Sequence, residues 1–144
     1  MLIRRATTQD LERWLTLRLL LWLGDPQEHL AEMTDMIADP LCAVFLMETS
    51  DKRMVGFLEA AQRKYADGCD TSPVGYIEGW YVEPDFRRAG LGRSLVQAAE
   101  DWARQLGLHE MASDCLIDNQ ISYNAHTSLG YEEVERLIHF RKRL

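Results

Sequence analysis

The chain has 144 residues, of which 47% are hydrophobic and 27% are charged, and its formal net charge is −7. This length and composition predict one globular domain over residues 1–144. Nucleic-acid binders need a basic face for the phosphates, so the acidic balance argues against a nucleic-acid partner. It suits a cationic partner better, although many acidic proteins are simply soluble, and composition alone favours that simpler interpretation.

Cysteine usage and hydropathy indicate the compartment. The three cysteines, Cys42, Cys69 and Cys115, form neither a CxxC pair nor a His-linked spacing, so no metal site and no disulfide framework is expected. The isolated His29, His109 and His139 are predicted to lie on the surface or in loops. The first ten residues lack the apolar core of a signal peptide, and the longest apolar run, 19–23, is too short for a membrane span. We expect a cytoplasmic protein with no membrane partner.

The first half of the chain combines two helix patterns with four strand patterns. A helix capped by Thr7 or Thr8 is predicted over residues 11–22, because apolar side chains recur there at three- and four-residue steps. A second helix, over about residues 27–38, ends before Asp39-Pro40, because the residue preceding a proline is steered away from helical angles. Turn sequences separate the predicted strands, which cover residues 1–5, 41–49, 53–64 and 74–82.

The second half begins with a helix that starts near Gly92 and carries an apolar face of Leu95, Ala98, Ala99, Trp102 and Leu106. A buried strand is predicted over residues 109–115, a helix closed by Gly130 over residues 119–129, and two short strands within residues 131–144. This order of elements predicts an α+β fold, in which helices cover both faces of a central mixed, mostly antiparallel sheet.

The loop sequence RRAGLGRS, residues 87–94, lies between a predicted strand and a predicted helix. Gly90 and Gly92 either relieve backbone strain in an ordinary turn or let backbone N–H groups approach an anion. In the second case the positive end of the helix dipole reinforces the N–H groups, and a pyrophosphate fits there. The nucleotide-binding patterns GxGxxG and GxxxxGKS are absent.

The pattern Arg87-x-x-Gly90-x-Gly92, directly after a strand that ends in Val82, resembles the acetyl-coenzyme A signature of the Gcn5-related N-acetyltransferases (GNAT). Further stretches, spread over nearly the whole chain, are similar to the chromosomal type of aminoglycoside 6′-N-acetyltransferases. These stretches are Leu21-Trp22-x-Gly24-x-Pro26, Tyr65-x-x-Gly68-Cys69-Asp70-x-Ser72-Pro73-Val74, Glu78-Gly79 with Val82, Met111-Ala112-Ser113-Asp114 and Arg141-Lys142-Arg143. The resemblance implies the GNAT fold, acetyl-coenzyme A as cosubstrate and no metal.

The resemblance also implies which residues bind the cosubstrate. The backbone of residues 80–82 pairs with the pantetheine arm like an added strand, the loop 87–94 holds the pyrophosphate, and an asparagine at the start of the next helix contacts coenzyme A. Carried over by position, the cofactor-binding residues are Trp80, Tyr81, Val82, Arg87, Arg88, Ala89, Gly90, Leu91, Gly92, Arg93, Ser94 and Asn119.

For the amine substrate, the residues implied by the resemblance are Trp22, Tyr65, Glu78, Asp114 and Glu135. An aminoglycoside carries several ammonium groups, and a pocket with carboxylate walls both concentrates and orients such a cation. The alternative for each acid is a structural role, in which Glu78 only pairs with an arginine and Asp114 only caps a turn.

The candidate catalytic residues are Glu78, Asp114 and His126. Glu78 is the candidate to accept a proton from the amine, directly or through water. Many GNAT enzymes place a tyrosine four residues before the glycine that closes the helix, and here His126 occupies that position. His126 is therefore a replacement acid, a packing residue or a polar contact to the cofactor. Tyr123 lies three residues earlier and would approach the thioester sulfur from another angle.

The predicted activity is acetyl transfer from acetyl-coenzyme A to the 6′-amine of aminoglycoside antibiotics, by direct attack of the amine on the thioester, which confers resistance. One alternative is acetylation of another amine, such as a polyamine or a peptide N-terminus. A second alternative is a non-catalytic acetyl-coenzyme A sensor, although retention of both Glu78 and Asp114 argues against it. The resemblance further suggests a homodimer.

Overall fold

A computed structural model describes all residues from Met1 to Leu144. Its elements follow in chain order: β1 (Leu2–Arg5), η1 (Thr8–Asp10), α1 (Leu11–Leu21), α2 (Pro26–Ala38), β2 (Cys42–Glu48), β3 (Met54–Arg63), β4 (Val74–Val82), η2 (Pro84–Phe86), α3 (Leu91–Gln105), β5 (Met111–Ser113) and α4 (Gln120–Ser128). The strands form one sheet in the order β1-β2-β3-β4-β5, and only β4 and β5 pair in parallel. The predicted α+β fold with a mixed, mostly antiparallel sheet is confirmed.

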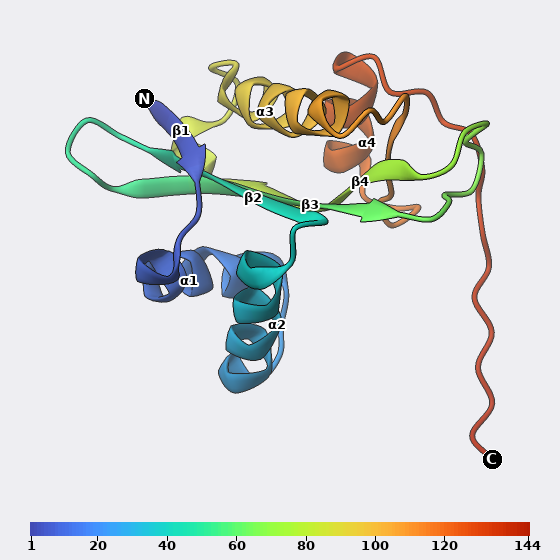
Figure 1. Ribbon diagram of the computed structural model, residues 1–144, viewed down its shortest axis with the longest axis horizontal. Helices are drawn as coiled ribbons and strands as arrows, with labels where there is room; N and C mark the ends of the chain where they lie inside the picture. The colour runs from blue at the N-terminus through green and yellow to red at the C-terminus, as the bar shows by residue number, and fades with distance from the viewer.

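The helices lie in two layers, because α1 and α2 cover one face of the sheet and α3 and α4 cover the other (Figure 1). On the first face, Trp14 and Met33 pack against strand residues that include Phe57. On the second face, the predicted apolar face of α3 packs on the sheet through Leu95 and Trp102. No helix of the structure has the length and apolar character that a membrane span requires.

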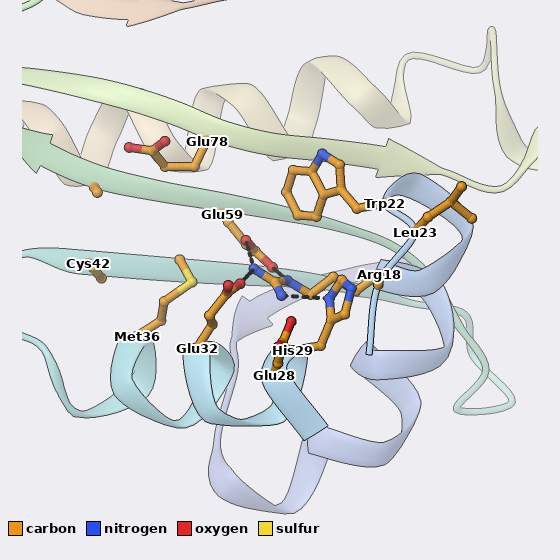
Figure 2. A pocket seen from close by; sticks show the side chains of 12 residues that line it. Arg18, Trp22, Leu23, Glu28, His29, Glu32, Met36, Cys42, Glu59 and Glu78 are labelled. Carbon is orange, nitrogen blue, oxygen red and sulfur yellow. Dashed lines mark hydrogen bonds and ion pairs between the residues drawn. The ribbon is translucent and has the colours of Figure 1, made fainter. Parts of the chain in front are cut away.

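A buried arginine joins α1 and α2 to β3 (Figure 2). The Nε of Arg18 donates to Oε1 of Glu59 at 2.8 Å, and its Nη atoms lie 2.9 Å from Oε2 of Glu32 and 2.7 Å from Nδ1 of His29. Arg18 is 5% exposed and Glu59 is 1% exposed. Burial raises the pKa of Glu59, and the hydrogen bond from Arg18 opposes that shift. The prediction for His29 was wrong, since this side chain is buried in α2 against Arg18.

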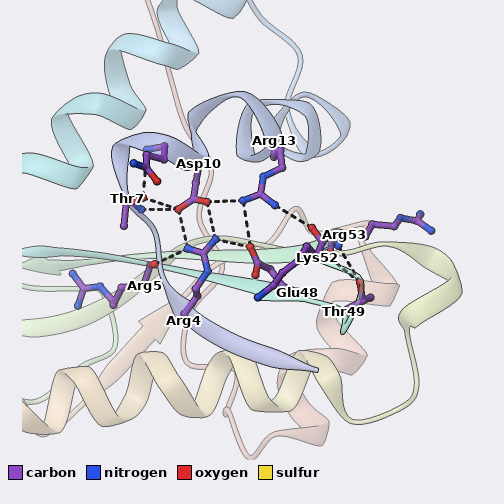
Figure 3. A network of polar contacts seen from close by, with 10 residues as sticks. Arg4, Arg5, Thr7, Asp10, Arg13, Glu48, Thr49, Lys52 and Arg53 are labelled. Carbon is purple, nitrogen blue, oxygen red and sulfur yellow. Dashed lines mark hydrogen bonds and ion pairs between the residues drawn. The ribbon is translucent and has the colours of Figure 1, made fainter.

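A second arginine clamp fixes the N-terminal strand (Figure 3). The guanidinium of Arg4 donates to both carboxylate oxygens of Asp10, at 2.8 and 2.7 Å, and also to Glu48. Thr7 and Asp10 form a capping box at the start of η1. Of the two threonines that the sequence offers as caps, Thr7 is therefore the one used. The hydrogen bonds from Arg4 hold the pKa values of Asp10 and Glu48 below their usual range. The clamp therefore stays charged down to acidic pH.

The strand predicted over residues 109–115 is much shorter in the structure. Only Met111–Ser113 form β5, and these three residues are half-buried rather than buried. They pair with Gly75, Tyr76 and Ile77 at the beginning of β4, so the rest of β4 has no strand on that side. The consequence is a free backbone edge along Glu78 to Val82, next to α4.

The two strands predicted within residues 131–144 are absent, and this prediction was wrong. The segment runs away from the sheet and ends far from it (Figure 1). No backbone hydrogen bond joins residues 132–144 to another part of the chain. Its apolar side chains are largely exposed, with 80% for Ile138 and 92% for Phe140. The alternation of apolar residues signals strand propensity, but a strand forms only where a neighbouring strand offers hydrogen bonds, and this chain supplies none there.

Candidate active site

The predicted cofactor half of the site begins where α3 starts. Gly90, the residue before α3, has φ +75° and makes no side-chain cap, and no acidic residue lies in the first turn. The first N–H groups of a helix have no partner inside the helix, so the amides of Leu91, Gly92 and Arg93 are open to an anion. Arg88 also has a positive φ, of 62°, which bends the loop before the helix. This geometry fits the pyrophosphate cradle that the sequence predicts.

Two arginines of the loop are already engaged. The Nε of Arg87 donates to the carbonyl oxygen of Val82 at 2.7 Å, and its guanidinium lies 5.6 Å from the ring centroid of Tyr81. The Nη2 of Arg93 donates to the carbonyl oxygen of Ser128, so it connects α3 to α4. Both side chains fix the loop against its neighbours.

Trp80 connects the loop with the free edge of β4. Its indole lies against Gly92, because a Cβ built there would be 2.8 Å from Cζ2 of Trp80. The indole Nε1 is the one buried side-chain nitrogen or oxygen in the structure that has no hydrogen-bond partner. A buried donor without a partner costs free energy, so this N–H suits an acceptor on a molecule that enters between β4 and α4.

His126 of α4 stands beside Trp80, with ring centroids 5.7 Å apart and an interplanar angle of 87°. Its Nδ1 lies 2.7 Å from the carbonyl oxygen of Ser122, and its Nε2 lies 2.8 Å from Oγ of Ser113. A carbonyl oxygen only accepts, so the proton of the neutral ring is on Nδ1, and Nε2 accepts from the hydroxyl of Ser113. Asn119 caps the same helix, because its Oδ1 accepts from the N–H of Ser122 at 3.1 Å.

The acidic half of the site lies across β3, β4 and β5. Arg63 donates from Nε to Oε1 of Glu78 at 2.8 Å and from Nη2 to Oε2 at 2.6 Å. The hydroxyl of Tyr76 donates to Oδ2 of Asp114. Burial, then the bond to Asp114, raise the pKa of Tyr76. The structure thus shows the arginine pairing that the sequence left open for Glu78. Asp114 accepts from a phenol, and no backbone N–H donates to it as a turn cap would require.

Trp22 lines both of the cavities on this side of the molecule. Its ring lies directly on the backbone of Gly79, since a Cβ there would be 2.1 Å from Cη2 of Trp22. On the other side, the guanidinium of Arg18 lies 5.0 Å from the ring (Figure 2). Both Trp22 and Glu78 line a cavity of about 610 Å³ under α2, whose other acidic side chains are those of Glu28, Glu32 and Glu59.

A larger cavity, of about 1760 Å³, joins the acidic half to Trp80. The predicted site residues that line it are Trp22, Tyr65, Glu78, Trp80, Asp114, Asn119, His126 and Glu135. Tyr65 is 72% exposed at its rim, and Glu135 belongs to the extended C-terminal segment. The loop 87–94 does not line this cavity and adjoins it through the contact of Gly92 with Trp80. Three residues that shape the site, Arg18, Arg63 and Tyr76, were not predicted from the sequence.

Comparisons with known proteins show the family to which this chain belongs. The chain matches the acetyltransferase (GNAT) family over residues 8–131. It is 43% identical over 140 residues to the aminoglycoside N(6′)-acetyltransferase type 1 of Stenotrophomonas maltophilia, with 96% of this chain and 91% of that protein covered. The aminoglycoside 6′-N-acetyltransferase AAC(6′)-Ig of Acinetobacter haemolyticus superposes with a TM-score of 0.95 at 41% identity, and the match covers 100% of this chain and 99% of that one.

A further solved structure bears on the ligands. AAC(6′)-Iy, in complex with the bisubstrate analogue CoA-S-monomethyl-acetylneamine, superposes with a TM-score of 0.92 at 40% identity, covering 99% of this chain and 97% of that chain. The sequence and structural matches extend over nearly the whole chain, and the resemblance that the motifs indicate is confirmed. The chain belongs to the acetyltransferase (GNAT) family, within the group that the aminoglycoside N(6′)-acetyltransferases of type 1 represent.

Proposed function

We propose that this protein transfers the acetyl group of acetyl-coenzyme A to the 6′-amino group of aminoglycosides, and that residues 1–144 act as one N-acetyltransferase domain. The observation that carries the proposal is one cavity with carboxylates at one end and the edge of β4 at the other. Acetyl-coenzyme A supplies a thioester, whose carbonyl carbon the free amine attacks while the C–S bond breaks and the thiolate leaves. Acetylation removes a positive charge that the drug needs to bind ribosomal RNA, so the activity confers resistance.

The cosubstrate is held by backbone rather than by charged side chains in this proposal. No strand pairs with the edge of β4 at Trp80, Tyr81 and Val82, where only the carbonyl of Val82 is engaged, by Arg87. This edge offers hydrogen bonds to the amides of a pantetheine arm, as an added strand would. The amides of residues 91–93 bind the pyrophosphate, with Arg87, Arg88, Ala89, Gly90 and Ser94 shaping the loop around them. Asn119, at the start of α4, lies on the same cavity wall.

The amine substrate occupies the acidic half. Glu78 and Asp114 attract its ammonium groups, and Trp22, Tyr65 and Glu135 complete the wall. Glu78 accepts the proton that the 6′-amine loses before attack, directly or through water. Arg63 takes one bond on each oxygen of Glu78, so an amine that reaches this carboxylate must compete with the guanidinium for it.

Asp114→Asn tests the substrate half. The variant keeps an oxygen that accepts from Tyr76, so the fold is retained, but it loses the negative charge. We expect the KM for a 6′-amino aminoglycoside to rise about tenfold, because a hydrogen bond to a charged group contributes roughly 1.5–3 kcal/mol. Steady-state kinetics should show an unchanged KM for acetyl-coenzyme A. Asp118→Asn is the matched control, since Asp118 lies in the same loop and does not line the cavity. Equal damage to both KM values would indicate a structural role.

His126 is proposed to be a packing and positioning residue rather than the acid. Both ring nitrogens are engaged, and the Nδ1 proton points to a backbone carbonyl of its own helix. We expect His126→Ala to lower kcat less than about tenfold, whereas a general acid contributes about 10²- to 10⁴-fold. A larger loss of kcat with unchanged affinity for acetyl-coenzyme A would make the histidine the acid.

We also propose a cytoplasmic location and a homodimer. The cysteines are free thiols, as is usual in the cytoplasm, and the cosubstrate is found there. Residues 132–144 present unpaired backbone and exposed apolar side chains, for which a second copy of the chain is the partner. Light scattering should give twice the monomer mass for the full chain, and a chain truncated after Tyr131 should give the monomer mass. A monomeric full chain would contradict the homodimer.

A thiol-release assay with acetyl-coenzyme A tests the whole proposal. The panel contains 6′-amino and 6′-hydroxy aminoglycosides, polyamines and peptides. We expect release only with the 6′-amino compounds. Faster release with polyamines or peptides would favour the alternative amine, and calorimetric binding of acetyl-coenzyme A without any release would favour a sensor.

A further inference from the structure

The two proposed substrate carboxylates are connected by a chain of contacts through Arg63 and Tyr76. The fork of Arg63 holds Glu78 through two parallel hydrogen bonds, and the guanidinium carbon of Arg63 lies 3.5 Å from the ring centroid of Tyr76. The hydroxyl of that same Tyr76 donates to Asp114. Strands β3 and β4 and the residue directly after β5 therefore contribute one continuous chain of contacts, in which Arg63 is the cation between two acids.

We propose that Arg63 is a specificity-determining residue of the amine site, because its guanidinium is an internal cation with which the substrate must compete for Glu78. This inference rests on the proposed function, in which Glu78 binds an ammonium group of the substrate. A substrate with one ammonium group gains little by displacing an arginine that already makes two bonds and a stacking contact. A substrate with several ammonium groups is attracted by the remaining acids as well, and it competes successfully.

The exposure of the pair makes the competition possible. The side chains of Arg63 and Glu78 are 43% and 29% exposed, and both line the large cavity. A partly exposed pair is screened by water and contributes modestly to stability, so a ligand can replace it. The clamp around Arg18 differs, because that guanidinium and Glu59 are almost completely buried and no ligand reaches between them. Arg63 is therefore the arginine of the acidic half that can be displaced.

Arg63→Gln removes the competing charge and leaves a polar side chain. The probes are neamine, which carries several ammonium groups, and 6-amino-6-deoxyglucose, which carries one. We expect the KM for neamine to fall and the KM for the monoamine to fall about fivefold more than that. The factor follows because an exposed ion pair contributes up to about 1 kcal/mol, which corresponds to about fivefold in binding. The ratio of the two KM values therefore moves toward one, and isothermal calorimetry should show the same change in the two dissociation constants. Raised salt should weaken neamine binding to the wild-type protein.

Two further variants separate charge from structure. Arg63→Lys keeps the charge and loses the fork, so the KM ratio should stay within about twofold of wild type. Arg53→Gln removes an arginine from an exposed pair with Glu83, and neither residue lines the cavity, so it should change neither KM.

Weaker binding of both probes to Arg63→Gln, or a KM ratio equal to that of wild type, would overturn the inference. So would an Arg63→Lys variant whose KM ratio equals that of Arg63→Gln, since the stacking and fork geometry would then decide. Calorimetry distinguishes this failure from failure of the proposed function, because it measures cation binding without acetyl transfer. A wild-type protein that binds neamine and does not acetylate it contradicts the proposed function alone.

Discussion

Gly92→Val is expected to lower the affinity for acetyl-coenzyme A by about tenfold or more while the protein remains folded. The Cβ of the valine would lie 2.8 Å from Cζ2 and 3.4 Å from Nε1 of Trp80, and its two methyl groups need further room. The indole must then move along the edge of β4, where we propose that the pantetheine arm binds. Isothermal calorimetry with acetyl-coenzyme A measures the loss, and circular dichroism verifies the fold.

The control for this variant is at the other end of α3. Gly107 has φ +78°, and a Cβ there would meet nothing within 4 Å. Gly107→Ala therefore costs about 1 kcal/mol of backbone strain with no effect on the loop. The affinity of this control for acetyl-coenzyme A should equal that of the wild type. A folded Gly92→Val protein with wild-type affinity would show that the space between Gly92 and Trp80 is not needed for the cosubstrate.

Arg18→Met should destabilise the protein by about 3–5 kcal/mol, since it leaves a buried carboxylate without its cation. Glu59, 1% exposed, would keep only the hydrogen bond from Nε1 of Trp14, at 3.0 Å. Urea unfolding monitored by fluorescence gives the free energy of unfolding.

The loss of stability in Arg18→Met should also depend on pH. Burial already raises the pKa of Glu59, and the loss of Arg18 raises it further. A raised pKa in the folded state favours the protonated form, so the variant should lose more stability at pH 8 than at pH 5.

A second substitution tests the cause of that loss. Arg18→Met/Glu59→Gln removes the negative charge together with the positive one and keeps an oxygen that accepts from Trp14. We expect most of the stability to return, because replacing both members of a buried pair is often close to neutral. Arg104→Met is the surface control, since Arg104 pairs with Asp101 on the exposed side of α3, and it should cost less than about 1 kcal/mol. A double variant as unstable as Arg18→Met would point to lost packing rather than to an unpaired charge.

The sequence predicts the sheet and the helices through local signals. These signals each lie within a few residues of the element they predict, and the elements are present. They are the apolar periodicity, the proline after Asp39 and the glycine loop. The prediction of two C-terminal strands was wrong because strand pairing does not depend on local signals alone. Residues 131–144 have suitable alternation, but pairing depends on an edge elsewhere, and this is not a local property. The same holds for β5, which extends only as far as its pairing with β4.

The site could be predicted only in part. The motifs indicate Glu78, Asp114 and the loop 87–94, because spacing and resemblance single them out. Arg63 is an ordinary residue at the end of a strand, and only the β3–β4 register brings it beside Tyr76 and Glu78. Arg18 interrupts the apolar pattern that predicts the helix over residues 11–22, and its charge there is explained only once Glu59 is known to be buried opposite. Both arginines act through partners that lie far away in the sequence.

The four tryptophans lie at positions where their intrinsic fluorescence can distinguish unfolding from ligand binding. Trp14 and Trp102 are buried in the two cores, so their emission should respond to unfolding and little to ligands. Trp80 stands at the edge of β4 with a free N–H, and Trp22 borders the acidic half beside Gly79. The two halves of the site therefore each contain one fluorophore. With Trp22 replaced by phenylalanine, emission should follow the cosubstrate through Trp80, and with Trp80 replaced, it should follow the amine through Trp22.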